Sequence, residues 1–259
     1  METFLSIRLT EMLQRRYRRR VPDVRVARPD ECAADASRVI MDHLGSTDPV
    51  IGLATGRSTT ALHRHLLSSH RAGRTDLGRA TWVMLDEFVG IAPTDPRSFR
   101  NQLCRDFVTA FDAAATSLVG PDLGLVDPSA ICTAFRSVAS GLTPGVQVLG
   151  IGRNGHVGFN EPGSAADSGT RLVDLSASTL ADLDPAEWPV HDRPARAVTR
   201  GIADIAAART IVLLAFGTSK AGAIAAALNG PATADCPASL LRDHADLRVF
   251  VDRDAASLL

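Results

Sequence analysis

The sequence lacks any apolar run long enough to cross a membrane, and it has few cysteines. None of its hydrophobic stretches approaches about 18 consecutive apolar residues, so we expect no transmembrane helix. Its four cysteines lie far apart, with no Cys-x-x-Cys pair. This spacing argues against a disulfide framework and a zinc ribbon, and favours reduced thiols in a cytoplasmic protein. Because an apolar core and a cleavage site are missing from the N-terminal segment, we expect no secretory signal.

Lysine is almost absent, and so is any surplus of charge. The 28 basic residues include a single lysine, Lys220, and they face 29 acidic residues for a net charge of −1. Aromatic residues make up 5% of the chain and do not interleave with basic ones. These features disfavour a nucleic-acid partner. Residues 1–20 carry six Arg and two Glu. We predict a basic extension there, as a solvated segment or an oligomer contact, and a single catalytic domain over 21–259.

What is present is an alternation of short apolar runs with segments of helical spacing. The runs are VIGLAT (50–55), TWVMLD (81–86), VQVLGIG (146–152), ARTIVLLAFG (208–217) and LRVFVD (247–252). Helices are predicted after Gly56, at 98–111, at 127–142 with Asp127 as the N-cap, and after Gly217. Continuous apolar strands separated by helices predict an α/β fold. We expect a three-layer αβα, Rossmann-like, mainly parallel sheet with helices on both faces.

Polar residues after these strands are the functional candidates, because ligands of such sheets bind beyond the carboxyl ends of strands. The first strand is followed by Thr55, Gly56, Arg57, Ser58 and Thr59. A glycine and hydroxyls at the start of a helix suit an anion, although a hydroxyl that merely caps the helix is an equal alternative. Lys220 lies one turn after the fourth strand. It would complement a phosphate in the first loop, or be a solvated helix residue.

Two adjacent carboxylates, Asp86 and Glu87, end the second run. In an extended chain they point to opposite faces. One would face the cleft as a general base, and the other would meet solvent or a structural partner. A purely helix-capping acid is the alternative.

The third strand leads into the densest polar cluster. An imidazole, a carboxylate and two carboxamides occur within residues 154–161, in a glycine-rich loop. Histidine is the natural proton shuttle near neutral pH, and a nearby carboxylate orients it and tunes its pKa. The candidate catalytic residues are Asn154, His156 and Glu161. No HExxH or GxSxG motif is present, and we expect no metal site.

Five segments together resemble one known family. They are LATGRST (53–59), MLDEFVG (84–90), GIGRNGHVGFNEPG (150–163), RAVTRGI (196–202) and AFGTSKAGAI (215–224). They resemble the glucosamine-6-phosphate deaminase/isomerase family, which shares its fold with 6-phosphogluconolactonase. The most specific segment is GHVGFNEPG, because the lactonase branch lacks its Asn-Glu-Pro. The Asn-Gly-His, the RAVTRGI segment and Pro237-Ala238-Ser239 are most similar to the galactosamine-6-phosphate deaminase branch.

The resemblance implies a role for each candidate. His156, supported by Glu161, would open the sugar ring, and Asp86 would move a proton between C2 and C1. Asn154 stands beside His156 where the glucosamine branch has Asp. The phosphate would be held by Thr55, Gly56, Ser58, Thr59 and Lys220, with Arg57 as an added contact. Gly152 would let the loop backbone pack against the sugar. The family requires no metal or organic cofactor.

We therefore expect a deaminase that converts galactosamine 6-phosphate or glucosamine 6-phosphate to a ketose 6-phosphate and ammonia. The expected partner is this small molecule, with no membrane, and a homo-oligomer stays open. One alternative is a 6-phosphogluconolactonase-type hydrolase. Another is a non-catalytic sugar-phosphate sensor, which Asn154 favours and which the joint presence of Asp86, His156 and Glu161 disfavours.

Overall fold

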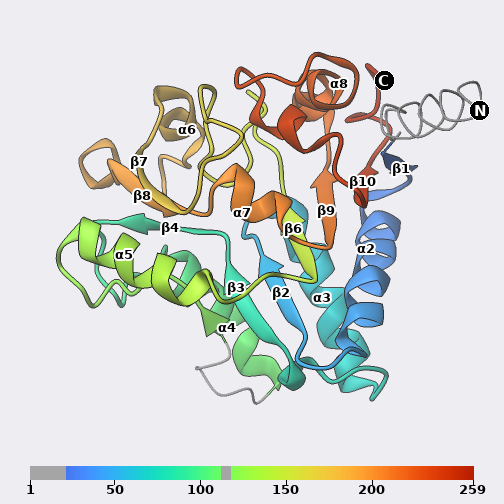
Figure 1. The fold of residues 1–259 in the computed structure, drawn as a ribbon, viewed down its shortest axis with the longest axis horizontal. Helices are drawn as coiled ribbons and strands as arrows, with labels where there is room; N and C mark the ends of the chain where they lie inside the picture. Colours follow the sequence, from blue (N-terminus) through green and yellow to red (C-terminus); the bar gives the residue numbers. More distant parts are fainter. Residues whose placement is uncertain (1–21, 112–117) are drawn as a thin grey trace, which may run out of the picture.

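The computed structural model describes residues 22–111 and 118–259 (Figure 1). A parallel sheet runs through the molecule in the order β1-β10-β9-β6-β2-β3-β5. Its strands are β1 (Asp23–Val26), β2 (Val50–Leu53), β3 (Thr81–Met84), β5 (Leu118–Val119), β6 (Val146–Leu149), β9 (Thr210–Ala215) and β10 (Leu247–Val251). Each of the five predicted apolar runs contributes a strand to this sheet. The basic extension predicted at 1–20 lies outside the described residues.

Helices cover both faces of this sheet. Along β9, Val212 and Leu214 pack with α2 (Pro29–Leu44) and α3 (Arg57–Arg71). The alternate residues Ile211 and Leu213 pack with α7 (Ile202–Ala206) and α8 (Ala221–Asn229) on the opposite face. Successive side chains of a strand lie on opposite faces of the sheet. Because β9 has apolar side chains on both faces, helices must pack against each face of the sheet. The expected three-layer α/β fold is confirmed.

The remaining helices begin and end at recognisable signals. They are α4 (Phe99–Asp106), α5 (Pro128–Ala139) and α6 (Ala177–Asp182). As predicted, Asp127 caps α5, and its carboxylate accepts from the Ser129 and Ala130 backbone N–H groups at 3.2 Å each. The helix predicted over 98–111 is shorter than expected because Phe107 leaves the helical region. Short 3₁₀ turns occupy Leu77–Arg79, Val108–Phe111, Val190–Asp192, η5 (Thr218–Lys220) and η6 (Pro237–Leu241).

A second, antiparallel sheet was not predicted from the sequence. It has the order β4-β8-β7, with β4 at Asp86–Val89, β8 at Arg196–Thr199 and β7 at Arg171–Asp174. The predicted run 81–86 is divided at Leu85. The Leu85 N–H donates to Leu53 of the parallel sheet at 2.9 Å, and its carbonyl accepts from Arg200 N, next to β8, at 2.8 Å. Asp86 therefore starts a strand of the second sheet instead of ending one of the first.

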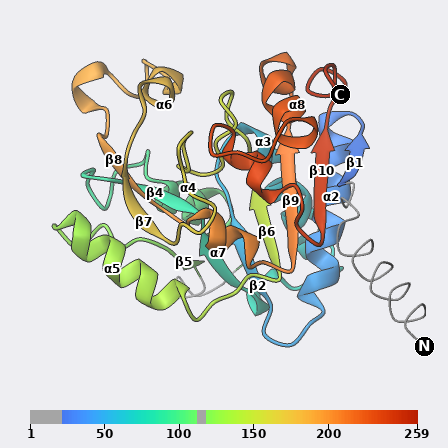
Figure 2. The ribbon, with the colours of Figure 1, turned by 45° about the horizontal axis from the view of Figure 1, so that its top comes forward.

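The parallel strands bring their carboxyl ends to one edge of the sheet. In Figure 1 the arrowheads of β2, β6 and β9 point to the same side of the molecule, where α6 and α8 lie. Figure 2 shows the yellow loop that follows β6 between α6 and α8. The polar segments that follow these strands are therefore gathered at one edge. Within the described part of the chain, no helix is both long and apolar enough to span a membrane.

Candidate active site

The loop after β6 is a tight turn built around His156. The Gly152 N–H donates to the His156 carbonyl at 2.9 Å, which closes the turn. A Cβ added to Gly152 would lie 2.4 Å from the His156 ring, so glycine lets the imidazole lie against the backbone. We predicted contact between Gly152 and a sugar. In the structure the neighbour of Gly152 is the catalytic candidate itself.

Glu161 lies behind the imidazole and accepts from several side chains. The buried Nδ1 of His156 faces Glu161 Oε1 at 3.4 Å, an ion-pair distance that is long for a hydrogen bond. Catalytic hydrogen bonds are often this loose before substrate binds. Asn154 donates from Nδ2 to Glu161 Oε2 at 2.8 Å, and its Oδ1 accepts from the His156 N–H at 3.2 Å. The structure thus brings Asn154, His156 and Glu161 together.

Hydrogen bonding keeps Glu161 ionised. Burial alone would raise its pKa, but the neighbouring His156, the Thr179 hydroxyl and Asn154 outweigh burial and lower the pKa of Glu161 to about 2. A carboxylate that stays charged at neutral pH favours a proton on the nearer nitrogen of His156. The outer nitrogen, Nε2, is then the atom that exchanges protons with a ligand.

Helix α6 contributes two contacts that the sequence analysis missed. The Thr179 hydroxyl donates to Glu161 Oε1, and Ser178 Oγ accepts from Asn154 Nδ2 at 3.2 Å. Both residues lie in the first turn of α6, which Ser176 caps. Hydroxyl residues at a helix start are usually caps, so the sequence carried no signal that these two reach the site.

Asp86 is a buried carboxyl group beside this loop. Its relative exposure is 7%. Burial, with a smaller contribution from the negative charge of Glu87, raises the pKa of Asp86 to about 8. A Cβ on Gly158 would lie 3.1 Å from Asp86 Oδ2, and Gly158 has a φ of +56°. Glycine at 158 therefore lets the His156 loop approach Asp86 closely.

The second carboxylate, Glu87, is structural. It is fully buried, and because it follows Asp86 on β4 its side chain lies on the opposite face of that strand. It accepts from Ser98 Oγ at 2.7 Å, Phe99 N at 3.0 Å and Arg100 N at 2.8 Å. These are the free donors at the start of α4. Glu87 is therefore the carboxylate that meets a structural partner, and Asp86 is the one that lies beside the His156 loop.

The loop after β2 places Gly56 at the N-cap of α3, with a φ of +120°. Thr55 and Ser58 are half-buried, and Gly56 and Arg57 are exposed. Thr59 differs from the expectation. Its exposure is 1%, and its hydroxyl donates back to the Ala54 and Gly56 carbonyls at 3.1 and 3.0 Å. Thr59 therefore supports the turn, whereas the exposed loop and the helix N-terminus remain suited to an anion.

Lys220 lies in the segment that follows β9, the fourth predicted strand. It is half-buried at the end of η5, and Gly217 fixes the preceding turn by donating to both oxygens of Asp252 at 3.0 Å. Burial lowers the pKa of Lys220; Asp182 opposes this effect, and Arg57 and Arg153 add to it. The charges of Arg57 in the β2 loop, Arg153 in the β6 loop and Asp182 in α6 therefore all affect Lys220.

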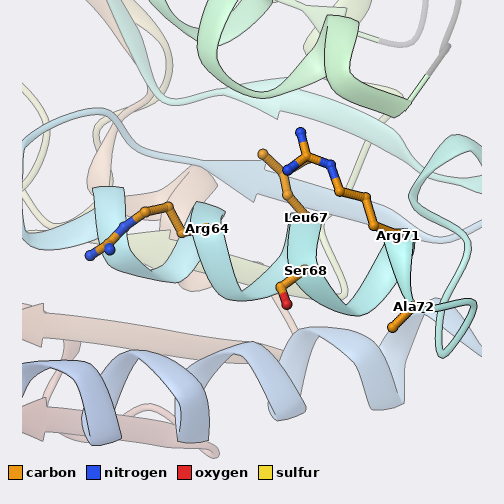
Figure 3. A pocket seen from close by; sticks show the side chains of 5 residues that line it. All are labelled: Arg64, Leu67, Ser68, Arg71 and Ala72. Atoms are coloured by element: carbon orange, nitrogen blue, oxygen red, sulfur yellow. The ribbon is translucent and has the colours of Figure 1, made fainter.

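Elsewhere among the described residues we find weaker candidates for a functional site. No group of three or more His, Cys, Asp or Glu residues among 22–111 and 118–259 is placed to hold a metal ion. The expectation of a cofactor-free site stays a prediction. A hollow of about 540 Å³ lies on α3, lined by Arg64, Leu67, Ser68, Arg71 and Ala72 (Figure 3). It contains none of the candidate residues.

Known proteins match the chain over most of its length. The model of the family described as glucosamine-6-phosphate isomerases/6-phosphogluconolactonase matches residues 27–250. A glucosamine-6-phosphate deaminase of Corynebacterium aurimucosum is 36% identical over 234 residues, which cover 89% of this chain and 91% of the relative. One from Streptomyces coelicolor is 36% identical over 244 residues, or 92% of this chain and 91% of the relative.

Solved structures agree in fold. A monomeric glucosamine-6-phosphate deaminase superposes with a TM-score of 0.87 at 34% identity, over 92% of this chain and 100% of that one. The 6-phosphogluconolactonase of Trypanosoma brucei superposes with a TM-score of 0.75 at 21% identity, over 92% and 98% of the two chains, which is a likeness of fold alone. The family resemblance is confirmed, while its galactosamine branch stays a prediction. With a family model matched over residues 27–250 and relatives 36% identical across most of its length, the chain belongs to the glucosamine-6-phosphate isomerase/6-phosphogluconolactonase family.

Proposed function

We propose that this protein is a hexosamine-6-phosphate deaminase, which converts an amino-sugar phosphate and water to a ketose 6-phosphate and ammonia. The observation that carries the proposal is the approach of buried Asp86 to the His156 loop at Gly158, with Glu161 behind the imidazole. Relatives that bear the name glucosamine-6-phosphate deaminase support the reaction class. Among hexosamines we favour galactosamine 6-phosphate, on the RAVTRGI and Asn-Gly-His segments.

Ring opening is assigned to His156. The step moves a proton from the anomeric hydroxyl O1 to the ring oxygen O5, while the C1–O5 bond breaks and C1 becomes an aldehyde. An imidazole whose inner nitrogen faces the ionised Glu161 can take the proton at its outer nitrogen and return it to the other oxygen. Asn154 holds Glu161 in place through its 2.8 Å hydrogen bond.

The isomerisation is assigned to Asp86. As carboxylate it removes the proton from C2, and as carboxylic acid it delivers a proton to C1. O1 gains a proton as C2 loses its own, and the amino nitrogen loses a proton as C1 gains one, so the aldehyde becomes a CH2OH group and the C2–N bond an imine. Water then hydrolyses the imine to the ketone and ammonia. A pKa of about 8 for Asp86 lies near the working pH, where one group can both accept and donate. The ammonium group that the substrate carries at C2 would favour the ionised form when it binds.

The phosphate is assigned to Lys220 and the start of α3. Lys220 supplies a positive charge, and the start of α3 with Gly56, Arg57 and Ser58 supplies backbone N–H groups and further donors. A phosphate fixed at C6 orients C1 and C2 without taking part in the reaction, so that remote binding energy contributes to positioning.

The test is ammonia release by the purified protein from galactosamine 6-phosphate and from glucosamine 6-phosphate. Asp86→Asn should abolish release, and Asp122→Asn, an exposed carboxylate in a turn after β5, serves as the matched control. The faster substrate identifies the epimer. The proposal is wrong if neither sugar releases ammonia, and hydrolysis of 6-phosphogluconolactone by the same protein would then assign it to the hydrolase alternative.

A further inference from the structure

An ion pair joins the catalytic loop to α6, next to the lysine assigned to phosphate. Arg153 follows the Gly-Ile-Gly of the β6 loop, and Asp182 is the last residue of α6. Arg153 Nε lies 3.3 Å from Asp182 Oδ2, and Arg153 Nη2 makes a second, shorter contact with Oδ1. The guanidinium and the carboxylate thus meet through two pairs of atoms, which is the geometry that an arginine also offers to a phosphate.

The surroundings of this pair carry a surplus of positive charge. Burial lowers the pKa of Lys220, and the guanidiniums of Arg57 and Arg153 add to this effect while the Asp182 carboxylate opposes it. Lys220, Arg57 and Arg153 come from three different segments at the carboxyl ends of the strands, and Asp182 is the carboxylate that pairs with Arg153. Both members of the ion pair are partly exposed, with side-chain exposures of 57% for Arg153 and 39% for Asp182, so a dissolved anion can reach them.

Asp182 lies on the same face of α6 as the residues that contact the catalytic loop. Ser178, four residues earlier, accepts from Asn154, and Thr179 donates to Glu161. Residues four apart on a helix are neighbours on its surface. The pairing of Asp182 with Arg153 therefore holds α6 against the loop at its last residue, as Ser178 and Thr179 do at its first turn.

We propose that Arg153 is a further phosphate-binding residue of this site, and that Asp182 is its resident counter-anion, which the phosphate of a ligand displaces. A phosphate dianion carries more charge than a carboxylate and offers more acceptor oxygens to the same guanidinium. Phosphate bound between Lys220 and Arg153 would replace the contact with Asp182. The sugar to which that phosphate belongs rests on the proposed function; the competition between phosphate and Asp182 does not.

Binding of inorganic phosphate, measured by calorimetry at constant ionic strength, tests the inference without any turnover. Asp182→Asn removes the competing charge and should bind inorganic phosphate roughly two- to fivefold more tightly, on the scale of an exposed ion pair. Asp184→Asn is the matched control: it makes the same change of charge two residues away, at a carboxylate that accepts from the Ala186 N–H. The control should bind phosphate as the unaltered protein does.

A double-mutant cycle separates the role of Arg153 from a general effect of charge. Arg153→Gln should bind inorganic phosphate more weakly, and Asp182→Asn should give no gain in the Arg153→Gln background. The inference is overturned if Asp182→Asn leaves phosphate binding unchanged, or if its gain persists without Arg153. Ammonia release measured alongside distinguishes the two claims. A protein that shows the predicted coupling but releases no ammonia contradicts only the proposed function.

Discussion

Asp86 and Glu87 show how strongly the environment of a side chain decides its chemistry. The two carboxyl groups are neighbours in sequence and both are buried. Burial raises the pKa of both groups, but hydrogen bonds from the start of α4 oppose this rise at Glu87, whereas the pKa of Asp86 reaches about 8. The sequence predicted that the pair would point to opposite faces. Which of the two faces the His156 loop depends on the second sheet, and the sequence did not reveal that sheet.

The raised pKa of Asp86 predicts a pH-dependent stability. The folded protein holds this proton up to about pH 8, whereas the unfolded chain loses it near pH 4. Between these values the folded state binds more protons, so its stability falls as pH rises, by up to about 1.4 kcal/mol per pH unit. Asp86→Asn cannot ionise. In urea denaturation at a series of pH values, it should gain stability over the unaltered protein from about pH 4 towards pH 8. A gap independent of pH would contradict the assignment.

A change at Asn154 should shift the pH at which activity is lost on the acid side of the pH profile. Asn154→Asp replaces the donor to Glu161 Oε2, 2.8 Å away, by a second carboxylate. Loss of the hydrogen bond from Asn154 and the added negative charge both raise the pKa of Glu161, so that Glu161 loses its charge at a higher pH. The acid limb of kcat/KM should therefore move to higher pH, by about one unit. Asn229→Asp, at the exposed end of α8, adds the same charge elsewhere and should leave the limb in place. Equal profiles for the two variants would show that Asn154 does not act on Glu161.

Two individual residues had a structural role that the family resemblance does not assign to them. Thr59 directs its hydroxyl into the turn that it belongs to. Gly152 makes room for the His156 ring. In both cases the residue lies in a segment that follows a parallel strand, as the sequence predicted, and the binding role of that segment stays a prediction. The sequence did not resolve which atoms face a ligand, because that depends on backbone geometry within the turn.

At the scale of elements, the continuously apolar strands were predictable, and strands of the same length with mixed polarity were not. The antiparallel strands β4, β7 and β8 have four residues each and mix polar with apolar side chains. Such segments give neither a continuous run nor a clear alternation. Helix α6 has six residues and no apolar stripe long enough to predict it. Yet these elements position Asp86 and contact Glu161, so the least predictable elements complete the site.

Glu87, which joins β4 to the start of α4, should contribute to the stability of the fold and not to catalysis. Glu87→Gln replaces one acceptor oxygen by an amide group that itself donates, against donors at 2.7–3.0 Å. Leaving buried donors without an acceptor should cost about 1–3 kcal/mol in the free energy of unfolding. Glu187→Gln, in an exposed turn after α6, should change stability by less than about 0.5 kcal/mol. Chemical denaturation measures both, and equal effects would contradict the structural role of Glu87.

At the scale of the whole molecule, the parallel sheet explains why distant segments share a site. Strands β2, β6 and β9 run in the same direction and are neighbours in the sheet. The segments that follow them are therefore adjacent although about 160 residues separate Gly56 from Lys220. The apolar runs predicted this convergence. They did not predict the order of the strands, because many orders satisfy the same pattern of burial.

The arrangement also predicts that the basic extension is dispensable for catalysis. The family match begins at residue 27, and the first strand begins at Asp23. A protein without residues 1–20 should keep the kcat and KM of the full chain for its hexosamine 6-phosphate. Steady-state kinetics of the two proteins tests this expectation. A marked loss of activity would instead place the extension within the catalytic unit.

The most direct test that Asp86 removes the proton from C2 is to follow the hydrogen at that carbon. The substrate is a hexosamine 6-phosphate that carries deuterium at this carbon, and product formation is followed by NMR. If Asp86 removes the C2 proton, the label leaves C2 as ammonia is released, and release is slower than with the unlabelled sugar. Asp86→Asn then keeps the label in place while it still binds inorganic phosphate. Ammonia release with deuterium retained at C2, or loss of the label catalysed equally by Asp86→Asn, would contradict the account.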